Sequence, residues 1–341
     1  MTKQRVFVAM SGGVDSSVAA ALLKDQGYDV CGITCTLFPE QRDVAPYAQE
    51  VARRLNIPHE ILDLSDIFAR CVTIPFCHDY CTGHTPNPCV SCNRDIKFGA
   101  MLDYARARSA HFFATGHYAR IGHSKDKKLL RAVDKTKDQS YFLYILTQSQ
   151  LTSIIFPLGE ILKSEVIQMA DQFGLTGAIR KEESQDLCFI PNGNYVSYVT
   201  RSQEAPAGEI ADIDGRVIGQ HQGLAYYTIG QRKGLGITTP TPLYVIKLDV
   251  THNQVVVGPQ DALYRRYLTA KGLSWVAGVP PTDLSGITAR VRYKSPEANT
   301  NITLSSNTLG VEFLTPQWGI APGQSIVFYR GEEVLGGGII E

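Results

Sequence analysis

The strongest constraint on the fold is the alternation of short apolar runs with helical patterns over the first half of the chain. Residues 6–10 are continuously apolar, as in a parallel strand that is buried on both faces. Apolar residues then recur at Val14, Val18 and Leu22, which predicts a helix that ends near Gly27. Such alternation is typical of an α/β domain built on a doubly wound parallel sheet. Further strands are predicted at 28–37, 58–64 and 112–115, and further helices at 43–55 and about 98–109.

The second half of the chain has a different pattern. After about Cys188, glycine, proline and short alternating runs dominate, as in 208–219, 227–237 and 242–250. Such runs are typical of small β-rich domains, the last of them barrel-like. With 341 residues the chain is long enough for two or three domains. We expect an α/β catalytic domain at 1–193, a β-rich linking domain at 194–263 and a barrel-like domain at 264–341.

Charge and hydropathy exclude few functions. Lys plus Arg and Asp plus Glu are each 33, so nucleic-acid binding would depend on local basic clusters rather than on net charge. No run approaches the roughly 20 apolar residues of a membrane-spanning helix, and the N-terminus lacks a signal-peptide pattern. We therefore expect a cytoplasmic protein with no membrane contact. In that compartment its eight cysteines are expected to be free, metal-binding or catalytic rather than structural disulfides.

The run SGGVDSS, residues 11–17, lies between the first predicted strand and helix. Its glycines let the backbone approach a ligand, and N–H groups at a helix start favour an anion. Ser11 and Ser16 add hydroxyl donors, and Asp15 is a candidate ligand for a magnesium ion that bridges phosphates. The run contains neither a Walker lysine nor the dinucleotide-binding glycine pattern. A plain glycine- and serine-rich turn is the alternative.

This run also resembles the PP-loop of the ATP pyrophosphatases. Those enzymes split ATP between its α and β phosphates and adenylate a substrate oxygen. Their loop grips the pyrophosphate leaving group and therefore needs no Walker lysine. The resemblance implies ATP and Mg²⁺ as cofactors.

The cysteines leave several interpretations open. Cys89 and Cys92 form a C-x-x-C pair, and Cys188 lies far along the chain. The pair could be redox-active, although no thioredoxin-like context surrounds it, or it could share a zinc site with Cys77 and Cys81. Alternatively, the three cysteines transfer sulfur, because an adenylated oxygen leaves readily and a persulfide or cluster-bound hydrosulfide is a strong nucleophile.

Seven motifs together carry a resemblance over the whole chain. They occur in the order SGGVDSS, TPNPCVSCNRDIKF, ATGHYAR, KDQSYFLY, SQDLCFIP, GQHQGLAYYTIGQRKGLGI and PGQSIVFYRGEEVLGGGII. The chain resembles the tRNA-specific 2-thiouridylases. The resemblance implies an ATP-dependent enzyme that adenylates O2 of the wobble uridine in Lys, Glu and Gln tRNAs and installs sulfur there. Its expected partners are the tRNA anticodon loop and a sulfur donor, either a persulfide-carrying protein or sulfide.

The resemblance also implies roles for individual residues. Cys188 matches the cysteine that carries a persulfide, and Cys92 matches its nucleophilic partner. The implied ATP contacts are Ala9, Met10, Ser11, Gly12, Gly13, Val14, Asp15, Ser16, Cys35 and Gly116. The implied tRNA contacts are Asn87, Pro88 and Cys89 at the target base, and His117, Lys137, Asp138, Gln139, Arg292, Tyr293 and Gln324 elsewhere.

One position departs from the family pattern. Many members have Asp where this chain has Cys89, so the site here gains a third soft ligand. Three thiolates, those of Cys89, Cys92 and Cys188, suit a [4Fe-4S] cluster with one open iron. Sulfur transfer through a persulfide on Cys188 with Cys92 as its partner, which we call the relay, is therefore one interpretation, and transfer through a cluster on the three cysteines is the other. Two other functions are also open: another PP-loop ATP-dependent ligase or amidotransferase, and a zinc-stabilised RNA-binding protein without catalysis.

Basic residues near the C-terminus are candidates for phosphate contact. The segment 287–293 alternates apolar and polar positions, which predicts a strand with Arg290 and Arg292 on its outer face. An ordinary solvated strand face is the alternative. If these arginines meet phosphates, tRNA binding should weaken as salt rises, because phosphate contacts release counterions.

Overall fold

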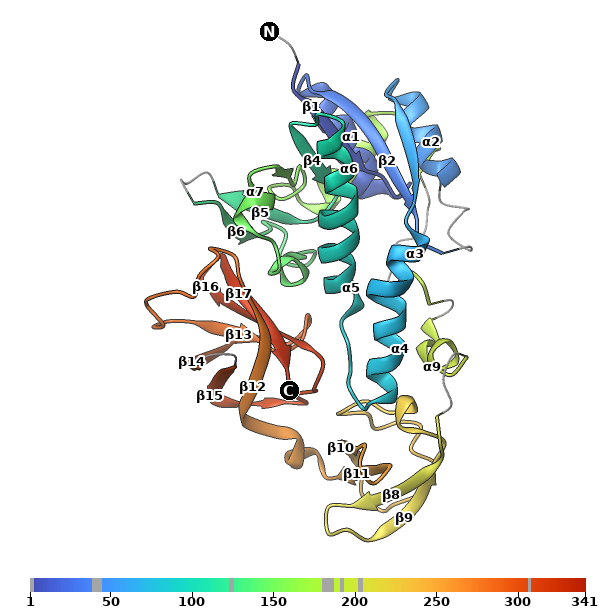
Figure 1. Cartoon of the computed structure of the whole chain (residues 1–341), viewed down its shortest axis with the longest axis vertical. Coiled ribbons are helices and arrows are strands. Elements are labelled where there is room, and N and C mark those ends of the chain that lie inside the picture. Colours follow the sequence, from blue (N-terminus) through green and yellow to red (C-terminus); the bar gives the residue numbers. More distant parts are fainter. Residues whose placement is uncertain are drawn as a thin grey trace.

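The computed structural model describes residues 3–38, 45–122, 126–179, 187–190, 193–201, 205–305 and 308–341. In this part of the chain the strands form three sheets. The N-terminal sheet lies at one end of the elongated molecule, the sheet of β8 to β11 at the other end, and the C-terminal strands between them (Figure 1). No helix of the described residues is long and apolar enough to span a membrane.

The N-terminal sheet is parallel and confirms the predicted doubly wound fold. Its strand order is β3-β2-β1-β4-β7. Val6 and Val8 pack into one hydrophobic cluster and Phe7 into another, so their strand is buried on both faces as predicted. The strands are β1 (Arg5–Ala9), β2 (Asp29–Thr36), β3 (His59–Asp63), β4 (Phe112–Thr115) and β7 (Ile154–Ile155). Helices α1 (Val14–Asp25), α2 (Ala45–Arg54) and α8 (Lys163–Gln172) belong to the same unit.

The first strand ends where the strand order of this sheet changes direction. Ala9 of β1 pairs with Ile33 of β2 on one side and with Thr115 of β4 on the other. The chain therefore leaves β1 between two parallel strands, with β2 and β3 on one side of β1 and β4 and β7 on the other. Open α/β sheets bind ligands at the carboxyl ends of their strands at such a point.

Two long helical segments, 65–81 and 88–107, stand beside the parallel sheet and carry most of the cysteines (Figure 1). The sequence predicts only the end of the second, at about 98–109. Parts of both segments are π-helical, which moves apolar side chains out of the 3.6-residue period that identifies a helix. The pieces are α3 (Ser65–Phe68), η2 (Ala69–Thr73), α4 (Ile74–Cys81), α5 (Pro88–Ser91), η3 (Cys92–Met101) and α6 (Leu102–Ala107).

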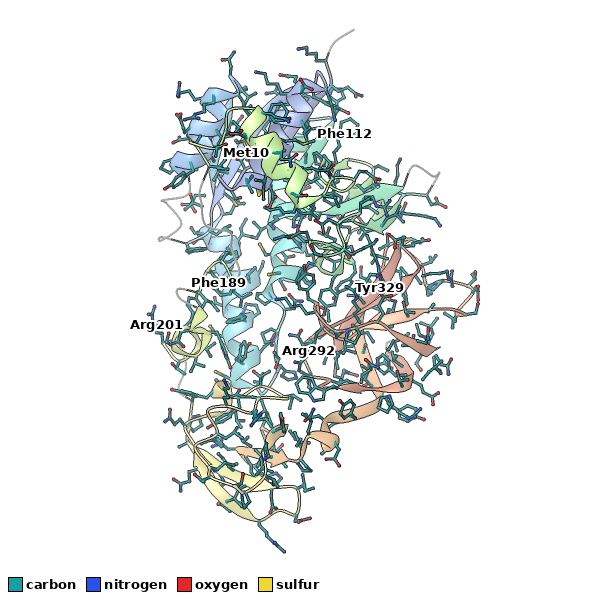
Figure 2. The ribbon with its side chains drawn as sticks, turned by 180° about the vertical axis from the view of Figure 1, so that it is seen from behind. Met10, Phe112, Phe189, Arg201, Arg292 and Tyr329 are labelled. Carbon is teal, nitrogen blue, oxygen red and sulfur yellow. The ribbon has the colours of Figure 1, made fainter. Side chains whose placement is uncertain are left out.

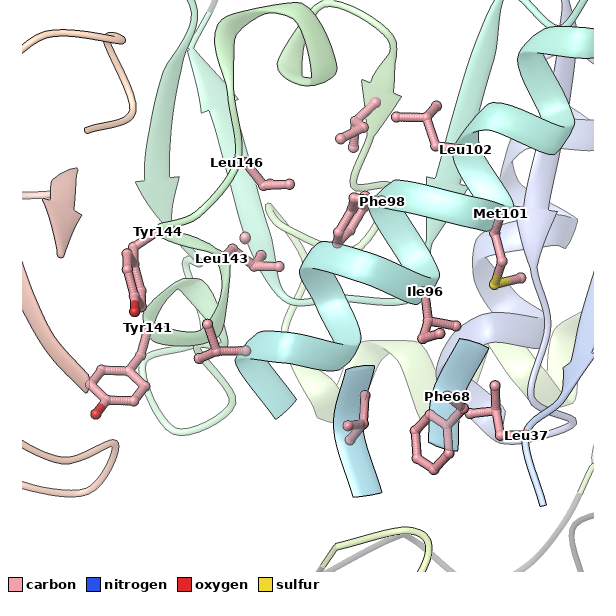
Figure 3. Close-up of a cluster of buried hydrophobic side chains, with 14 of the residues drawn as sticks. Leu37, Phe68, Ile96, Phe98, Met101, Leu102, Tyr141, Leu143, Tyr144 and Leu146 are labelled. Atoms are coloured by element: carbon pink, nitrogen blue, oxygen red, sulfur yellow. The ribbon is translucent and has the colours of Figure 1, made fainter. Parts of the chain in front are cut away.

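The second helical segment runs through the centre of the largest hydrophobic core. Its residues Ile96, Phe98 and Met101 are at most 2% exposed. Figure 3 shows them between Phe68 on one side and the segment that carries Leu143 on the other. The core therefore fixes the position of the helix that begins with the C-x-x-C pair. The nearby short elements are η4 (Ser140–Leu143) and α7 (Gln148–Leu151).

The central β-rich unit has strand order β10-β11-β8-β9. The β8–β9 hairpin falls within the predicted run 208–219, and β10 falls within 242–250. The expectation of β structure at 227–237 is wrong, because this segment holds no strand and three of its glycines have positive φ. The elements are α9 (Tyr195–Val199), β8 (Gly208–Asp212), β9 (Val217–His221), η6 (Leu224–Tyr226), β10 (Tyr244–Asp249), β11 (Gln254–Gly258) and η7 (Gln260–Leu263).

The C-terminal strands form the expected barrel, which closes where β12 pairs with β17. The sequence does not predict that a hairpin from the first half of the chain joins the same sheet, since Glu333 of β17 pairs with Leu130 of β6. The strands are β5 (Ala119–Gly122), β6 (Lys128–Arg131), β12 (Tyr264–Trp275), β13 (Thr288–Arg290), β14 (Ala298–Leu304), β15 (Leu309–Trp318), β16 (Ser325–Arg330) and β17 (Glu333–Ile340).

Candidate active site

The glycine-rich loop, residues 11–17, is held in shape by its own serines. Ser16 Oγ accepts a hydrogen bond from the Ser11 N–H at 3.1 Å and donates to the Gly13 carbonyl at 3.1 Å. Gly12 has a φ of 69°, in the region that favours glycine. Among the described residues no side chain caps helix α1 at Gly13. The first N–H groups of α1 are therefore available to an anion.

The predicted ATP contact Gly116 lies directly against this loop. A Cβ atom at Gly116 would be 2.8 Å from the backbone carbon of Asp15 and from the backbone nitrogen of Ser16. Real side chains do not approach a backbone so closely, so only glycine fits here without moving the loop. The structure thus brings Gly116, which follows β4, together with the loop that follows β1.

The Asp15 carboxylate is already partnered in the structure. Lys163 Nζ donates to Asp15 Oδ1 at 2.7 Å and to Oδ2 at 2.9 Å, and Tyr118 Oη donates to Oδ1 at 2.8 Å. The sequence identifies Asp15 as a candidate magnesium ligand and gives Lys163 no role. A metal ion at this carboxylate would have to share it with an ammonium group.

Four cysteines from separate parts of the chain interact electrostatically, and we call them the thiol group. Cys35 lies near the end of β2, Cys89 in α5 and Cys92 at the start of η3, and Cys188 comes from the segment 187–190. Burial raises the pKa of Cys92 to about 11, with a further contribution from Cys188. Burial also raises the pKa of Cys35 to about 12, with further contributions from Cys92 and Cys188. The thiols therefore affect one another's ionisation.

The aromatic neighbour of Cys188 anchors it beside the helices. Phe189 is buried, and its ring lies 5.6 Å from that of Phe68 and 5.2 Å from that of Phe76, between centroids. Figure 2 shows Phe189 between Met10 and Arg201 along the long axis of the molecule. Cys188 itself is exposed, whereas Cys89 is half-buried. The position of Cys188 thus depends on one inserted ring, and the residue as a whole is exposed although its thiol is shielded enough from water for its pKa to be raised.

The positive charge of Lys97 acts on all four cysteines of the thiol group, and the sequence gives this residue no role. Its positive charge lowers the pKa of Cys35, Cys89, Cys92 and Cys188 against the larger effect of burial. Lys97 Nζ lies 3.3 Å from Nε2 of His117, so that nitrogen accepts. His117 is buried, and burial together with Lys97 holds its pKa well below the usual value. A neutral His117 then donates from Nδ1 to Thr115 Oγ1 at 2.7 Å.

The barrel holds the loop that leads into the C-x-x-C pair. Gln324 Nε2 donates to the carbonyls of Thr85 and Pro86, at 2.8 and 3.3 Å. The Thr85 N–H donates to the Pro322 carbonyl at 2.7 Å. The Asn87 side chain hydrogen-bonds the phenol of Tyr141, whose hydroxyl donates to the Ser325 carbonyl at 2.7 Å. Two predicted tRNA contacts, Asn87 and Gln324, thus lie at one junction between the barrel and the N-terminal unit.

The predicted contacts 137–139 lie in a turn whose middle side chain is buried. Asp138 Oδ1 accepts from the backbone N–H of Ala132 and of Ser140, at 3.0 and 3.2 Å. Gln139 Oε1 accepts from the Tyr118 N–H at 3.0 Å. These side chains shape the turn, and Lys137 beside them is partly exposed. A tRNA contact through this turn stays a prediction.

The predicted alternation is confirmed, because Ile287, Ala289 and Val291 are buried in the barrel core and Arg290 and Arg292 lie on the opposite face. That face is covered by other side chains and is not an ordinary solvated one. Arg292 Nη2 donates to the carbonyls of Ile229, at 3.1 Å, and Gly319, so this side chain joins the central unit to the barrel. Arg290 pairs with Glu297 at 3.2 Å. Tyr293 stacks near Phe142, with ring centroids 4.5 Å apart. Segments of the other two units thus cover Arg292 and Tyr293, which alternation within one strand cannot reveal.

Metal binding by the cysteines finds no support in the geometry. In the described part of the chain, which includes Cys77, Cys81, Cys89, Cys92 and Cys188, no group of three or more His, Cys, Asp or Glu side chains is arranged to hold a metal ion. The donor set suits iron or zinc chemically, but the thiols are not arranged around a common centre. The zinc and cluster interpretations therefore rest on the sequence alone.

The chain matches three family descriptions in succession. Residues 4–192 match the tRNA methyl transferase HUP domain, 196–259 the tRNA methyl transferase PRC-barrel domain, and 265–340 the aminomethyltransferase beta-barrel domain. These matches cover all three units of the fold.

Curated relatives match the chain over nearly its whole length. The tRNA-specific 2-thiouridylase MnmA of Moorella thermoacetica is 46% identical, over 98% of this chain and 99% of its own length. The protein of the same name from Magnetococcus marinus is 44% identical, over 99% of both chains. Among solved structures, the U34-tRNA thiolase NcsA from Methanococcus maripaludis with its [4Fe-4S] cluster aligns at a TM-score of 0.38 and 20% identity. That alignment covers 60% of this chain and 67% of the other.

Proposed function

Because the chain belongs to the family of the tRNA-specific 2-thiouridylases, we propose that it uses ATP to replace O2 of the wobble uridine of tRNA with sulfur. The proposed substrates are the Lys, Glu and Gln tRNAs, the products are 2-thiouridine, AMP and pyrophosphate, and the proposed compartment is the cytoplasm. A second partner supplies the sulfur, as a protein-bound persulfide or as sulfide.

A series of contacts, extended to the thiols by the charge of Lys97, supports this proposal. The glycine-rich loop packs on Gly116, whose neighbour His117 accepts a hydrogen bond from Lys97. The charge of Lys97 in turn acts on Cys92 and Cys188. A loop suited to phosphate therefore lies within a few residues of thiols suited to sulfur transfer. Adenylation and sulfur insertion need this proximity because the first step activates the same oxygen that the second step replaces.

In the proposed first step, O2 of the uridine attacks the α-phosphorus of ATP. The bond from this phosphorus to the bridging oxygen of the β-phosphate breaks, and pyrophosphate leaves with the electron pair. The N–H groups at the start of α1 and the hydroxyl of Ser11 bind the phosphates, and Mg²⁺ accompanies the nucleotide. The proposed ATP contacts are Ala9, Met10, Ser11, Gly12, Gly13, Val14, Asp15, Ser16, Cys35 and Gly116.

In the proposed second step, the outer sulfur of a persulfide on Cys188 attacks C2 of the adenylated uridine, and AMP leaves. The Cys92 thiolate then attacks Sγ of Cys188, which releases the 2-thiouridine and leaves a Cys92–Cys188 disulfide. A thiol reductant restores the two thiols. The exposure of Cys188 suits a group that is reloaded from a donor, and the mutual influence of the two thiols suits their reaction with each other.

The tRNA contacts that we propose surround this site. Asn87, Pro88 and Cys89 contact the target base, which is cheaper to extrude from a single-stranded anticodon loop than from a duplex. Further proposed contacts are His117, Lys137, Asp138, Gln139, Arg292, Tyr293 and Gln324. We assign no step to a cluster on Cys89, Cys92 and Cys188, because these thiols do not form a metal-binding group within the described structure.

The decisive experiment incubates the protein without oxygen with ATP, unmodified tRNA and a small-molecule persulfide, which loads Cys188 by transfer of its outer sulfur and leaves as a thiol. A parallel arm contains sulfide, and the nucleosides of both arms are analysed by mass spectrometry. We expect ATP-dependent 2-thiouridine from the wild type. Failure to form both AMP and 2-thiouridine would overturn the proposed function.

A Cys89→Ser variant separates the relay from the cluster. The relay predicts that this variant keeps its first-turnover rate of sulfur transfer at saturating tRNA, because only Cys92 and Cys188 react and Cys89 contributes to binding of the base. An inactive Cys89→Ser protein, together with stoichiometric iron in the anaerobic wild type, would overturn the relay and support the cluster.

A further inference from the structure

The ion pair between Asp15 and Lys163 has no role in the steps described so far. Lys163 is the first residue of α8, and its side chain is only 10% exposed. Its ammonium group reaches both carboxylate oxygens of Asp15, at 2.7 and 2.9 Å. Asp15 belongs to the glycine-rich loop, so a buried cation from a remote helix lies at the proposed phosphate site.

Folding does not explain a lysine at this position. A positive charge at a helix N-terminus opposes the helix dipole, and burial of an ammonium group carries a desolvation cost. The backbone N–H of Lys163 already ties the start of α8 to Asp134 Oδ2 at 3.0 Å. An apolar side chain of the same length could keep this backbone bond without either electrostatic cost. A function for the charge would account for its presence.

We infer that Lys163 supplies the cation that stabilises the departing pyrophosphate and that Asp15 holds its ammonium group in place. This inference rests on the proposed adenylation. As the bond between the α-phosphorus and the bridging oxygen breaks, the bonding pair stays on pyrophosphate, and the ammonium donates hydrogen bonds to its oxygens without giving up a proton. The glycine-rich loop contributes only neutral donors, whereas the ammonium group of Lys163 is a charged donor and forms stronger hydrogen bonds to an anion.

The contacts of the Asp15 carboxylate with Lys163 and Tyr118 favour a role other than that of a magnesium ligand. Its two oxygens face the ammonium group, and Tyr118 donates a third hydrogen bond at 2.8 Å. The carboxylate charge is thereby compensated within the protein. Asp15 is thus a positioning residue for Lys163, and a magnesium ion brought in with the nucleotide would not need this carboxylate as a ligand.

The test compares Lys163→Met, Asp15→Asn and the double variant with the wild type. For each protein, the release of pyrophosphate with tRNA and ATP is measured, and the dissociation constants of inorganic pyrophosphate and of AMP are determined. Lys247→Met is the matched control, because Lys247 forms a 2.7 Å ion pair with Asp249 in the central unit. We expect Lys163→Met to lower the adenylation rate about a hundredfold and to weaken pyrophosphate binding about tenfold, while AMP binding stays unchanged.

The double variant keeps the inference falsifiable if a lone charge destabilises a single variant. It removes both charges and restores balance at the site. The double variant should fold like the wild type and adenylate as slowly as Lys163→Met. Recovery of adenylation in the double variant would show a structural ion pair and overturn the inference.

The Mg²⁺ dependence of adenylation tests the alternative in which Asp15 is a metal ligand. A raised Mg²⁺ requirement in Asp15→Asn but not in Lys163→Met would make Asp15 a metal ligand and overturn the inference. The wild-type control keeps the two claims separate. If the wild type does not convert ATP to AMP and pyrophosphate, the proposed function fails; if it does and Lys163→Met matches it, only the inference about Lys163 fails.

Discussion

The glycine-rich loop and the thiol group are neighbours in one site but are built in different ways. The loop is seven consecutive residues, shaped by its own hydrogen bonds and by the close approach of Gly116. The thiol group gathers cysteines from β2, α5, η3 and the segment 187–190. The loop therefore depends on backbone geometry, whereas the thiols depend on burial and on the charge of Lys97. Damage to one region should leave the step of the other intact.

This difference matches the two proposed steps. Adenylation develops negative charge on the departing pyrophosphate, and hydrogen-bond donors that are already in place are needed to stabilise it. Sulfur transfer requires thiols that stay protonated until they react, since a thiolate is the nucleophile and is easily lost to oxidation. The raised pKa values in the thiol group fit that second requirement.

The largest effect should come from the reacting cysteines. We predict that Cys188→Ser and Cys92→Ser each lower 2-thiouridine formation by at least about a thousandfold, because the nucleophile is lost. Pyrophosphate release in a first turnover should stay near the wild-type rate, since the glycine-rich loop is untouched. The measurement is a single-turnover assay of both products, with Cys81→Ser as the control. Loss of adenylation in these variants would mean that the two regions are not separable.

A glycine substitution should have the opposite selectivity. We predict that Gly116→Ala lowers adenylation about a hundredfold, because its Cβ would lie 2.8 Å from the backbone of Asp15 and Ser16 and displace the loop. Gly310→Ala is the matched control, since the nearest atoms to a Cβ there belong to Thr303 and lie 3.8 Å away. Rates of pyrophosphate release and thermal unfolding are measured for both. A Gly116→Ala protein with normal adenylation would contradict the proposed role of the loop.

The charge of Lys97 should affect the pH dependence of sulfur transfer. Lys97 lowers the pKa of each thiol in the group, so Lys97→Met should raise those pKa values further and leave less thiolate at neutral pH. We therefore predict that the rising limb of the pH–rate profile moves to higher pH and that the rate at neutral pH falls by about an order of magnitude. The control is Lys128→Met, whose ion pair with Glu333 is partly exposed. An unmoved profile would remove Lys97 from the mechanism.

The parts of the site that are contiguous in sequence are the parts that the sequence predicts well. SGGVDSS follows a buried strand and leads into a helix that begins within it at Val14, and the structure has that strand, turn and helix as predicted. Gly116 follows another strand of the same sheet, so its approach to the loop follows from the parallel topology. In both cases the local pattern and the sheet alone determine where the backbone goes.

Side-chain roles that depend on tertiary packing are not predicted. Lys97 lies within a motif that the sequence singles out, yet its charge reaches the thiols through a π-helical segment that a 3.6-residue period does not reveal. Lys163 begins a helix far from the glycine-rich loop in sequence. Arg292 belongs to an alternating strand pattern but turns toward carbonyls of two domains. Each of these placements depends on contacts between distant segments.

The smallest effect is expected where the barrel meets the N-terminal unit. Gln324→Leu removes two hydrogen bonds to the carbonyls of Thr85 and Pro86, which lead into the C-x-x-C pair. We predict a loss of about 1 kcal/mol in tRNA binding, or about a fivefold rise in KM for tRNA, with little change in kcat. Because Gln324 contacts neither the glycine-rich loop nor a thiol in the described structure, the KM for ATP should not change.

Steady-state kinetics with each substrate varied in turn would measure this effect. Gln254→Leu, in the central sheet, removes an exposed amide whose nearest partner is Glu209 at 3.4 Å, and it serves as the control. A drop in kcat for Gln324→Leu, with KM for tRNA unchanged, would mean that the barrel acts on the thiols rather than on tRNA binding. The thiol group would then depend on a third domain as well as on Lys97, and its contrast with the self-contained loop would be greater still.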